Sequence, residues 1–130
     1  MPIDTDYQFD PEERDAPSAP MTRVTLIYEN RKITCLALLD SGAAITTITE
    51  EARRALAPMR NGERLVGGAT KSAEFYPLYL VEKLYFSNHE YSNLSLVRLP
   101  TDSKIMLIGR DILNKHEILL DGPQEHMTVS

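Results

Sequence analysis

Apolar and polar positions alternate along most of this chain with the two-residue period of β-strands. Residues 22–28 follow this pattern, and residues 33–39 form a second such stretch after a short polar turn. We expect these two strands to pair as a hairpin. Positions 35–39 are apolar without interruption, which indicates that this end of the second strand is covered on both faces.

The rest of the chain predicts further short strands and two short helices. Strands are expected over 65–70, 75–86, 94–99, 107–108, 117–120 and 127–129, with turns at 61–62 and 87–90. Pro77 should lie at a sheet edge or a bulge. One helix should end at Leu56, with Thr47 and Glu50 at capping-box spacing, and Asp111 should cap the other, over 112–115. The pattern predicts an all-β domain with one or two short helices.

Length and composition fit one small domain. The chain has 130 residues, 42% of them hydrophobic, and a formal net charge of −5. It contains no apolar run near the ~20 residues of a membrane span and no basic-then-apolar signal pattern at its start. Its single cysteine, Cys35, cannot form an internal disulfide, so we expect a cytoplasmic protein with no membrane segment in this chain.

Charge is concentrated at the beginning of the chain. Residues 1–20 contain six acids, one arginine and half of the eight prolines. Such a segment is expected to be a disordered acidic tail that precedes a domain over residues 21–130. In that domain 13 acids balance 13 bases, which argues against a nucleic-acid partner. Its nearest approach to a basic cluster is best explained as a solvated face, and the residues are Arg53, Arg54, Arg60 and Arg64.

The histidines and the cysteine give no metal signature. His89, His116 and His126 share no ligand spacing with one another or with Cys35. We therefore expect no metal site and no cofactor.

Asp40 is the residue with the clearest chemical potential. It follows the apolar strand directly, so its carboxylate is delivered to the edge of a dry interior, where an unpaired charge is costly. Ser41 offers a short hydroxyl, and Gly42 permits backbone conformations closed to other residues and leaves the carboxylate open to a ligand. Asp-Ser-Gly alone is common in ordinary turns. Its position after a buried strand, and the downstream segment Leu107–Leu113 that answers it, make it a candidate active site.

With these motifs the sequence resembles the retropepsin-like aspartic proteases. Asp40-Ser41-Gly42-Ala43 is similar to the catalytic motif, residues 107–113 to the apolar-apolar-glycine element and its helix, and residues 65–69 to the glycine-rich flap. The resemblance implies an acid-protease lobe, closed and barrel-like, that forms a two-fold homodimer.

The resemblance also implies a role for each matched residue. Asp40 would be catalytic, and Ser41 would donate a hydrogen bond across the dimer axis. The remaining support of the active site would come from Gly42, Leu107, Ile108, Gly109 and Arg110. Substrate would be bound by Ala43, Ala44, Gly67, Gly68 and Ala69, with Leu38, Ile45, Val66 and Leu107 as candidate pocket walls. Viral members usually have an acid where this chain has Ala44, so Arg110 needs another partner or must bind backbone carbonyls.

The number of carboxylates determines the expected assembly. The mechanism implied by the family needs two aspartates facing one water, whereas this chain contains one Asp-Ser-Gly. A symmetric homodimer would supply the second copy of Asp40. Two full charges about 3 Å apart repel by roughly 5 kcal/mol at an effective dielectric constant near 20, so the pair would share one proton, as in aspartic proteases generally.

Two classes of function remain open from the sequence. The first is an aspartic endopeptidase that cuts peptide or protein substrates in extended segments with apolar residues near the cleaved bond. The second is a non-catalytic domain of the same fold that serves for dimerisation or peptide binding. The intact Asp40-Ser41-Gly42 favours the first, since a non-catalytic domain has no physical need for it. A peptidase that works only within a larger polyprotein or a membrane assembly would share the chemistry of the first class.

Overall fold

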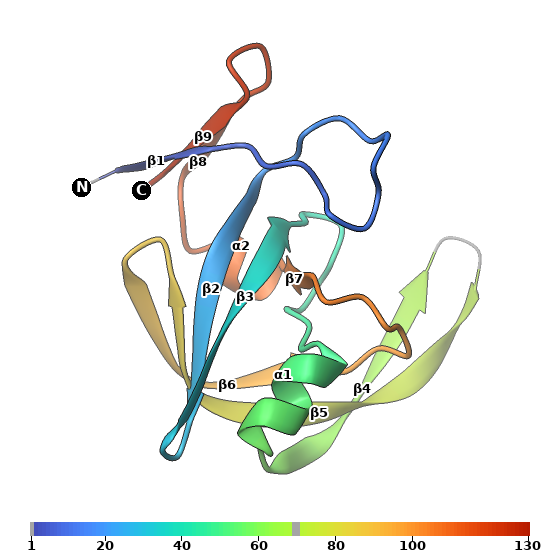
Figure 1. Ribbon diagram of the computed structural model, residues 1–130. Coiled ribbons are helices and arrows are strands. Elements are labelled where there is room, and N and C mark those ends of the chain that lie inside the picture. Colours follow the sequence, from blue (N-terminus) through green and yellow to red (C-terminus); the bar gives the residue numbers. More distant parts are fainter. Residues whose placement is uncertain (1, 69–70) are drawn as a thin grey trace.

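The alternating pattern near the start of the chain forms an antiparallel hairpin, β2 (Met21–Tyr28) and β3 (Arg31–Leu39), as the sequence predicts. The computed structural model describes residues 2–68 and 71–130 (Figure 1). Val24 lies opposite Cys35 in the hairpin, and both side chains are buried in the core. This inward face confirms the predicted period of two.

One short strand, β1 (Ile3–Asp6), precedes this hairpin, and the remaining elements follow it in chain order. They are α1 (Glu50–Leu56), β4 (Arg60–Gly68), β5 (Lys71–Phe86), β6 (His89–Val97), β7 (Met106–Ile108), α2 (Arg110–Leu113), β8 (Ile118–Asp121) and β9 (His126–Val129). The fold is therefore mostly β with two short helices, as expected. None of the helices in the described part of the chain has the length and apolar character that crossing a membrane requires.

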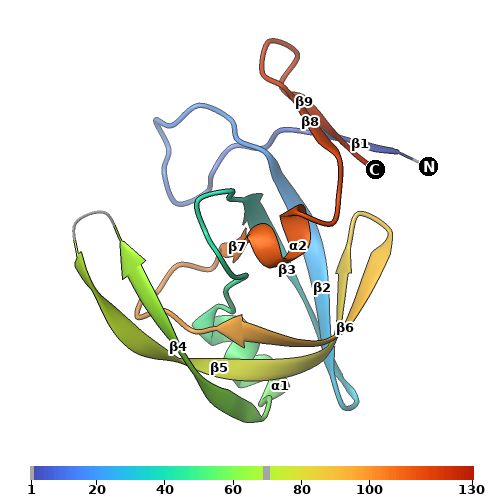
Figure 2. The same cartoon turned by 180° about the vertical axis from the view of Figure 1, so that it is seen from behind.

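The main sheet has the order β4-β5-β2-β3-β7, with β6 paired to β5. The long strand β5 pairs first with β4 and, near its end, with β2. Figure 2 shows the β4–β5 hairpin extending away from the body of the domain. The expected closed barrel is wrong, because β4 is exposed along nearly its whole length and offers no apolar face on which the sheet could close.

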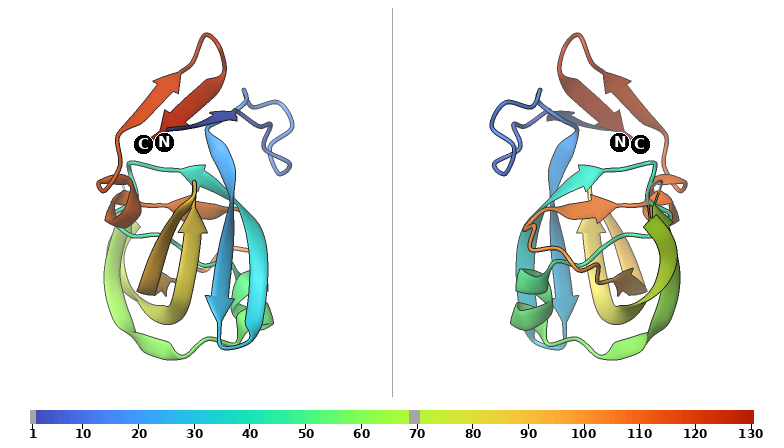
Figure 3. Two further views of the ribbon diagram at one scale, coloured as in Figure 1. Left: turned by 90° about the vertical axis from the view of Figure 1, so that its left-hand side faces the viewer. Right: turned by 90° about the vertical axis from the view of Figure 1, so that its right-hand side faces the viewer.

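A second sheet, of order β1-β9-β8, contains both ends of the chain (Figure 3). Ile3 lies opposite Val129, and the Pro20 carbonyl accepts a hydrogen bond from the Leu39 N–H at 3.0 Å. Glu12 accepts hydrogen bonds from the Lys104 N–H and, with a smaller effect, the Ser103 hydroxyl, and both lower its pKa. The described residues of this segment therefore pack against the rest of the domain, in place of the disordered tail expected for residues 1–20. Its order comes from partners distant in sequence, which local composition does not show.

Two details of the predicted turns and caps differ from the structure. Thr49, not Thr47, caps α1, and its hydroxyl accepts from the Ala52 N–H at 3.1 Å. The expected turn at Asn61-Gly62 is a register irregularity within β4, where Gly62 has φ +87°. Pro77 lies opposite Glu63 beside it, which confirms the predicted bulge.

The core lies between the main sheet, α1 and α2. Its buried members are Val24, Leu26, Cys35, Ala37, Ile48, Ala52, Leu56, Val81, Leu84, Phe86, Leu96, Met106, Ile108, Ile112 and Val129. Burial raises the pKa of the Cys35 thiol to about 11, in line with its expected role as a small core residue.

Candidate active site

Asp40 lies where two parallel strands end side by side. β3 and β7 pair in parallel, with Leu38 opposite Leu107 and Leu39 opposite Ile108. The Asp40 N–H donates to the Ile108 carbonyl at 2.9 Å and so continues this pairing by one residue. Both sequence motifs therefore meet at one edge of the sheet, and the partly buried Asp40 lies at its rim.

The loop after Asp40 is a tight turn held by its own backbone. The Gly42 N–H donates to Asp40 Oδ1 at 2.9 Å, and the Ala43 N–H donates to the Asp40 carbonyl at 3.1 Å. A Cβ at position 42 would lie 3.1 Å from Asp40 Oδ1. Glycine is thus explained by the close approach of the carboxylate and not, as the sequence suggested, by a backbone conformation closed to other residues, since Gly42 has no positive φ.

Gly109 is where the second motif packs under this loop. A Cβ there would lie 2.6 Å from the carbonyl carbon of Ile45 and 2.9 Å from the Ala43 oxygen. The Arg110 N–H donates to that same Ala43 oxygen at 2.8 Å. Backbone atoms of Gly109 and of the Asp40 loop are therefore in direct contact, and a side chain at position 109 would push the two segments apart.

Asp111 joins the two motifs through Thr46. The expected helix cap at Asp111 is wrong, since Gly109 takes the N-cap position of α2. Asp111 Oδ1 instead accepts from the Thr46 hydroxyl at 2.7 Å and from the Thr46 N–H at 3.0 Å. The Thr46 oxygen accepts in turn from the Gly109 N–H at 3.1 Å. Sequence reasoning missed this network, although the threonine-rich stretch Thr46-Thr47-Ile48-Thr49 was its visible signal.

Arg110 uses backbone in place of a carboxylate. Its Nη1 donates to the Ser41 carbonyl at 2.7 Å. Of the two outcomes left open by the alanine at position 44, binding to a backbone carbonyl is confirmed. The guanidinium thus holds the loop that carries Asp40.

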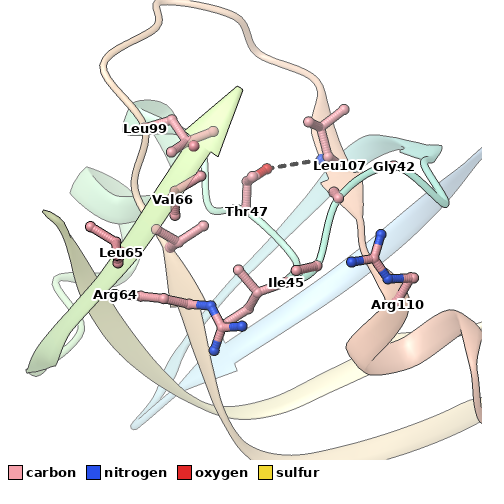
Figure 4. Close-up of a pocket in the computed structure, with 13 residues that line it drawn as sticks. Gly42, Ile45, Thr47, Arg64, Leu65, Val66, Leu99, Leu107 and Arg110 are labelled. Atoms are coloured by element: carbon pink, nitrogen blue, oxygen red, sulfur yellow. Dashed lines mark hydrogen bonds between the residues drawn. The ribbon is translucent and has the colours of Figure 1, made fainter. Parts of the chain in front are cut away.

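A cavity of about 330 Å³ opens beside this loop (Figure 4). It is bounded by the Asp40 loop, β4, the end of β6 and β7, and its lining residues are Gly42, Ala43, Ala44, Ile45, Thr47, Arg64, Leu65, Val66, Gly67, Val97, Leu99, Leu107 and Arg110. The Thr47 hydroxyl accepts a hydrogen bond from the Leu107 N–H at 2.9 Å and so links two of the lining segments. The cavity offers apolar walls with a few polar groups, as ligand sites do.

The structure brings most of the predicted site residues together here. Ala43, Ala44 and Gly67 line the cavity, while Gly68 lines a neighbouring one with Tyr76 and Leu99. Ser41 faces a separate apolar cavity between Leu39 and α2.

The buried residues Ile108 and Gly109 lie behind the loop. Ala69 lies outside the described residues. Of the candidate walls, Ile45, Val66 and Leu107 contribute, and Leu38 does not.

The sequence does not predict Leu99 and Arg64 as residues of the site. Leu99 lies just after β6, where Arg98 donates to Glu50 Oε2 at 2.9 Å and to the Thr101 carbonyl at 2.7 Å. Arg53, with Arg98 beside it, holds the pKa of Glu50 well below its usual range. Arg64 lines the cavity from β4 and is exposed, as expected of a solvated residue, although it lies on a strand and not on the expected helix face. Both residues depend on tertiary pairing, which no local pattern reveals.

No metal site is found among the described residues, where no group of three or more His, Cys, Asp or Glu side chains could hold an ion. The chemistry available at this edge is that of Asp40 and the hydrogen-bonded loop around it.

Parallel strand ends that carry Asp-Ser-Gly and Leu-Ile-Gly, beside a cavity walled by a β-hairpin, define a retropepsin-type lobe. The family model described as retroviral aspartyl protease matches residues 17–121. The chain belongs to this family.

Two solved structures share the fold. A retropepsin-like aspartic protease from Rickettsia conorii matches with a TM-score of 0.65 and 16% identity, over 99% of this chain and 89% of that one. EIAV protease, solved with the inhibitor HBY-793, matches with a TM-score of 0.54 and 21% identity, over 78% of this chain and 90% of the viral one. No match was found among curated protein sequences.

Proposed function

We propose that this protein is an aspartic endopeptidase whose active site contains two copies of Asp40 from a symmetric homodimer. The observation that carries the proposal is the position of Asp40 at the paired ends of β3 and β7, beside the cavity. Family membership supports aspartic peptidase activity in general. The assignment of Asp40 as catalytic and the dimer are the proposal.

The substrate is an extended peptide with apolar residues near the cleaved bond. The cavity presents Ile45, Val66, Val97, Leu99 and Leu107 as apolar walls. Ala43 and Ala44 line the cavity with small side chains, which leave room for the backbone of an extended substrate.

The reaction follows from one shared proton. The ionised Asp40 carboxylate takes a proton from a water molecule, whose oxygen attacks the scissile carbonyl carbon. The protonated carboxyl of the partner copy donates to the carbonyl oxygen as the tetrahedral intermediate forms. When the C–N bond breaks, the carboxyl that took the proton from water donates it to the amine nitrogen, and a hydroxyl of the intermediate returns a proton to the other carboxylate as the product acid forms. One shared proton remains on the pair, and no acyl-enzyme is formed.

The rigid loop keeps each carboxylate in place for this exchange. Gly42 N–H fixes Asp40 Oδ1, and Arg110 fixes the Ser41 carbonyl next to it. Because these donors are held by the Gly109 packing and the Thr46 network, little reorganisation is needed during the reaction.

The test is cleavage of a peptide library by the wild-type protein and by Asp40→Asn. Asparagine retains the Oδ1 acceptor for Gly42, so we expect loss of cleavage with unchanged circular dichroism and sedimentation. Asp102→Asn, at an exposed position, is the matched control and should cleave normally. Specific activity should also rise with protein concentration until dimers are saturated. Full activity in Asp40→Asn would refute the assignment, and a rate per chain independent of concentration across the dissociation range would refute the dimeric site.

A further inference from the structure

The charged side chains that line the cavity beside the Asp40 loop are all positive. Arg64 reaches toward it from β4 and Arg110 from the start of α2, from opposite sides (Figure 4). No Asp or Glu is among its thirteen lining residues. The Asp40 loop contributes the uncharged residues Gly42, Ala43 and Ala44 to this lining.

The Arg64 guanidinium differs from the other arginines around it. Arg60, four residues earlier on β4, pairs with Glu63 at 4.0 Å, and Glu50 binds Arg54 and Arg98 at 3.1 and 2.9 Å. Within the described part of the chain, the side chain of Arg64 has neither an ion pair nor a hydrogen bond. Its strand neighbour across the hairpin is Tyr76, whose hydroxyl donates to Glu74. The charge of Arg64 is therefore available to a ligand.

Arg110 adds a second cation that is only partly used. One of its nitrogens donates to the Ser41 carbonyl, which is neutral. The remaining donors of a guanidinium lie in a planar fork that matches a carboxylate. Two cations without a counter-charge repel each other, and an anion between them would relieve this repulsion.

On the proposed function stated above, we infer that this cavity is a subsite for an acidic side chain of the peptide substrate. The carboxylate of a glutamate or aspartate is bound between Arg64 and Arg110, while its methylene groups contact Val66 and Leu107. Charge-assisted hydrogen bonds to a carboxylate are among the stronger polar contacts of a protein surface. Arg64 is the specificity-determining residue, since Arg110 is also needed for the loop.

The location of the cavity restricts where the acid lies in the substrate. The cavity begins at Gly42, and Asp40 is not among its lining residues. The acidic residue therefore lies beyond the apolar residues that flank the cleaved bond and is not bound at the catalytic carboxylates themselves. In a two-fold dimer the cavity occurs twice, so the preference applies on both sides of the bond.

The test measures binding, so that it does not depend on turnover. Fluorescein-labelled ten-residue peptides with an apolar centre carry one glutamate, glutamine or lysine, moved through each position. They are titrated with Asp40→Asn protein at pH 6.5 and followed by fluorescence anisotropy. We expect at least one position at which the glutamate peptide binds about fivefold or more tightly than its glutamine analogue, with a preference that weakens as salt is raised.

Variants of the arginines identify the source of the preference. Arg64→Gln should remove most of it, and Arg64→Glu should shift it toward the lysine peptide. Arg60→Glu is the matched control, since it makes the same charge change on the same strand outside the cavity, and it should retain the preference. Equal binding of glutamate and glutamine peptides at every position, or an Arg60→Glu effect as large as that of Arg64→Glu, would overturn the inference.

The outcomes separate the subsite from the catalytic proposal. Wild-type cleavage of apolar peptides without any preference for glutamate would refute the subsite alone. Arg64-dependent binding of glutamate peptides without any cleavage would refute the peptidase assignment alone.

Discussion

Replacement of Gly109 by alanine tests whether the two halves of the site are held by backbone contact. A Cβ at this position would lie 2.6 Å from the Ile45 carbonyl carbon, 2.9 Å from the Ile45 nitrogen and 2.9 Å from the Ala43 oxygen. These are backbone atoms, so relief requires that the Asp40 loop move away from α2. Gly109 itself has φ −92°, which alanine adopts freely, so the cost comes from the contact.

The magnitude follows from the contacts that such a movement breaks. Overpacking of a tight site costs typically 1–3 kcal/mol. Separation of the loop from α2 also lengthens the hydrogen bonds from Arg110 N–H to Ala43 and from Gly109 N–H to Thr46, each worth about 1 kcal/mol. We expect Gly109→Ala to lose about 2–4 kcal/mol of unfolding free energy, a large part of the ~5–15 kcal/mol of a typical domain.

The assay is urea unfolding followed by far-UV circular dichroism, at two protein concentrations so that dimer dissociation is separated from unfolding. Gly122→Ala is the matched control, because nothing lies within 4 Å of a Cβ built there and its φ is not positive. It should leave stability unchanged or raise it by up to ~1 kcal/mol. A Gly109→Ala protein as stable as the wild type, to within about 0.5 kcal/mol, would refute the packing argument.

Two further substitutions test the polar contacts around the site. Thr46→Val leaves the Gly109 N–H and the Asp111 carboxylate short of a partner, so unfolding in urea should show a loss of about 2–3 kcal/mol. The same change at Thr34, an exposed residue of β3, should cost far less, and equal losses would contradict the network. Glu50→Gln removes a carboxylate whose pKa Arg53 and Arg98 depress below its usual value of 4.5. The Glu50→Gln protein should be less stable than the wild type by a constant amount above about pH 4.5, the ordinary pKa of the carboxyl. Below that pH the difference in unfolding free energy should shrink, because protons bind Glu50 of the unfolded wild-type chain before they bind it in the folded protein. A difference in unfolding free energy that stays constant from pH 7 to pH 3 would contradict this linkage.

Much of the fold and the centre of the site were predictable from short-range patterns. The β2–β3 hairpin follows from alternation, whereas the apolar run at 35–39 is fully buried on one face only, at Cys35 and Ala37, and not on both faces as expected. Asp40 and Gly109 were found because each sits at the end of such a run, where a change in residue type stands out. These features depend on residues a few positions apart, whose relation is fixed by strand geometry.

The sequence by itself determined which strands form and which carboxylate lies at the end of a buried one. Only the tertiary structure decided that the sheet stays open, that Ile3–Asp6 pair with β9 and Glu12 binds Ser103, and that Asp111 binds Thr46 in place of capping its helix. It alone placed Arg64 across the cavity from Arg110. These arrangements bring together residues more than 30 positions apart, and which residues meet depends on how the strands assemble, which no local pattern encodes.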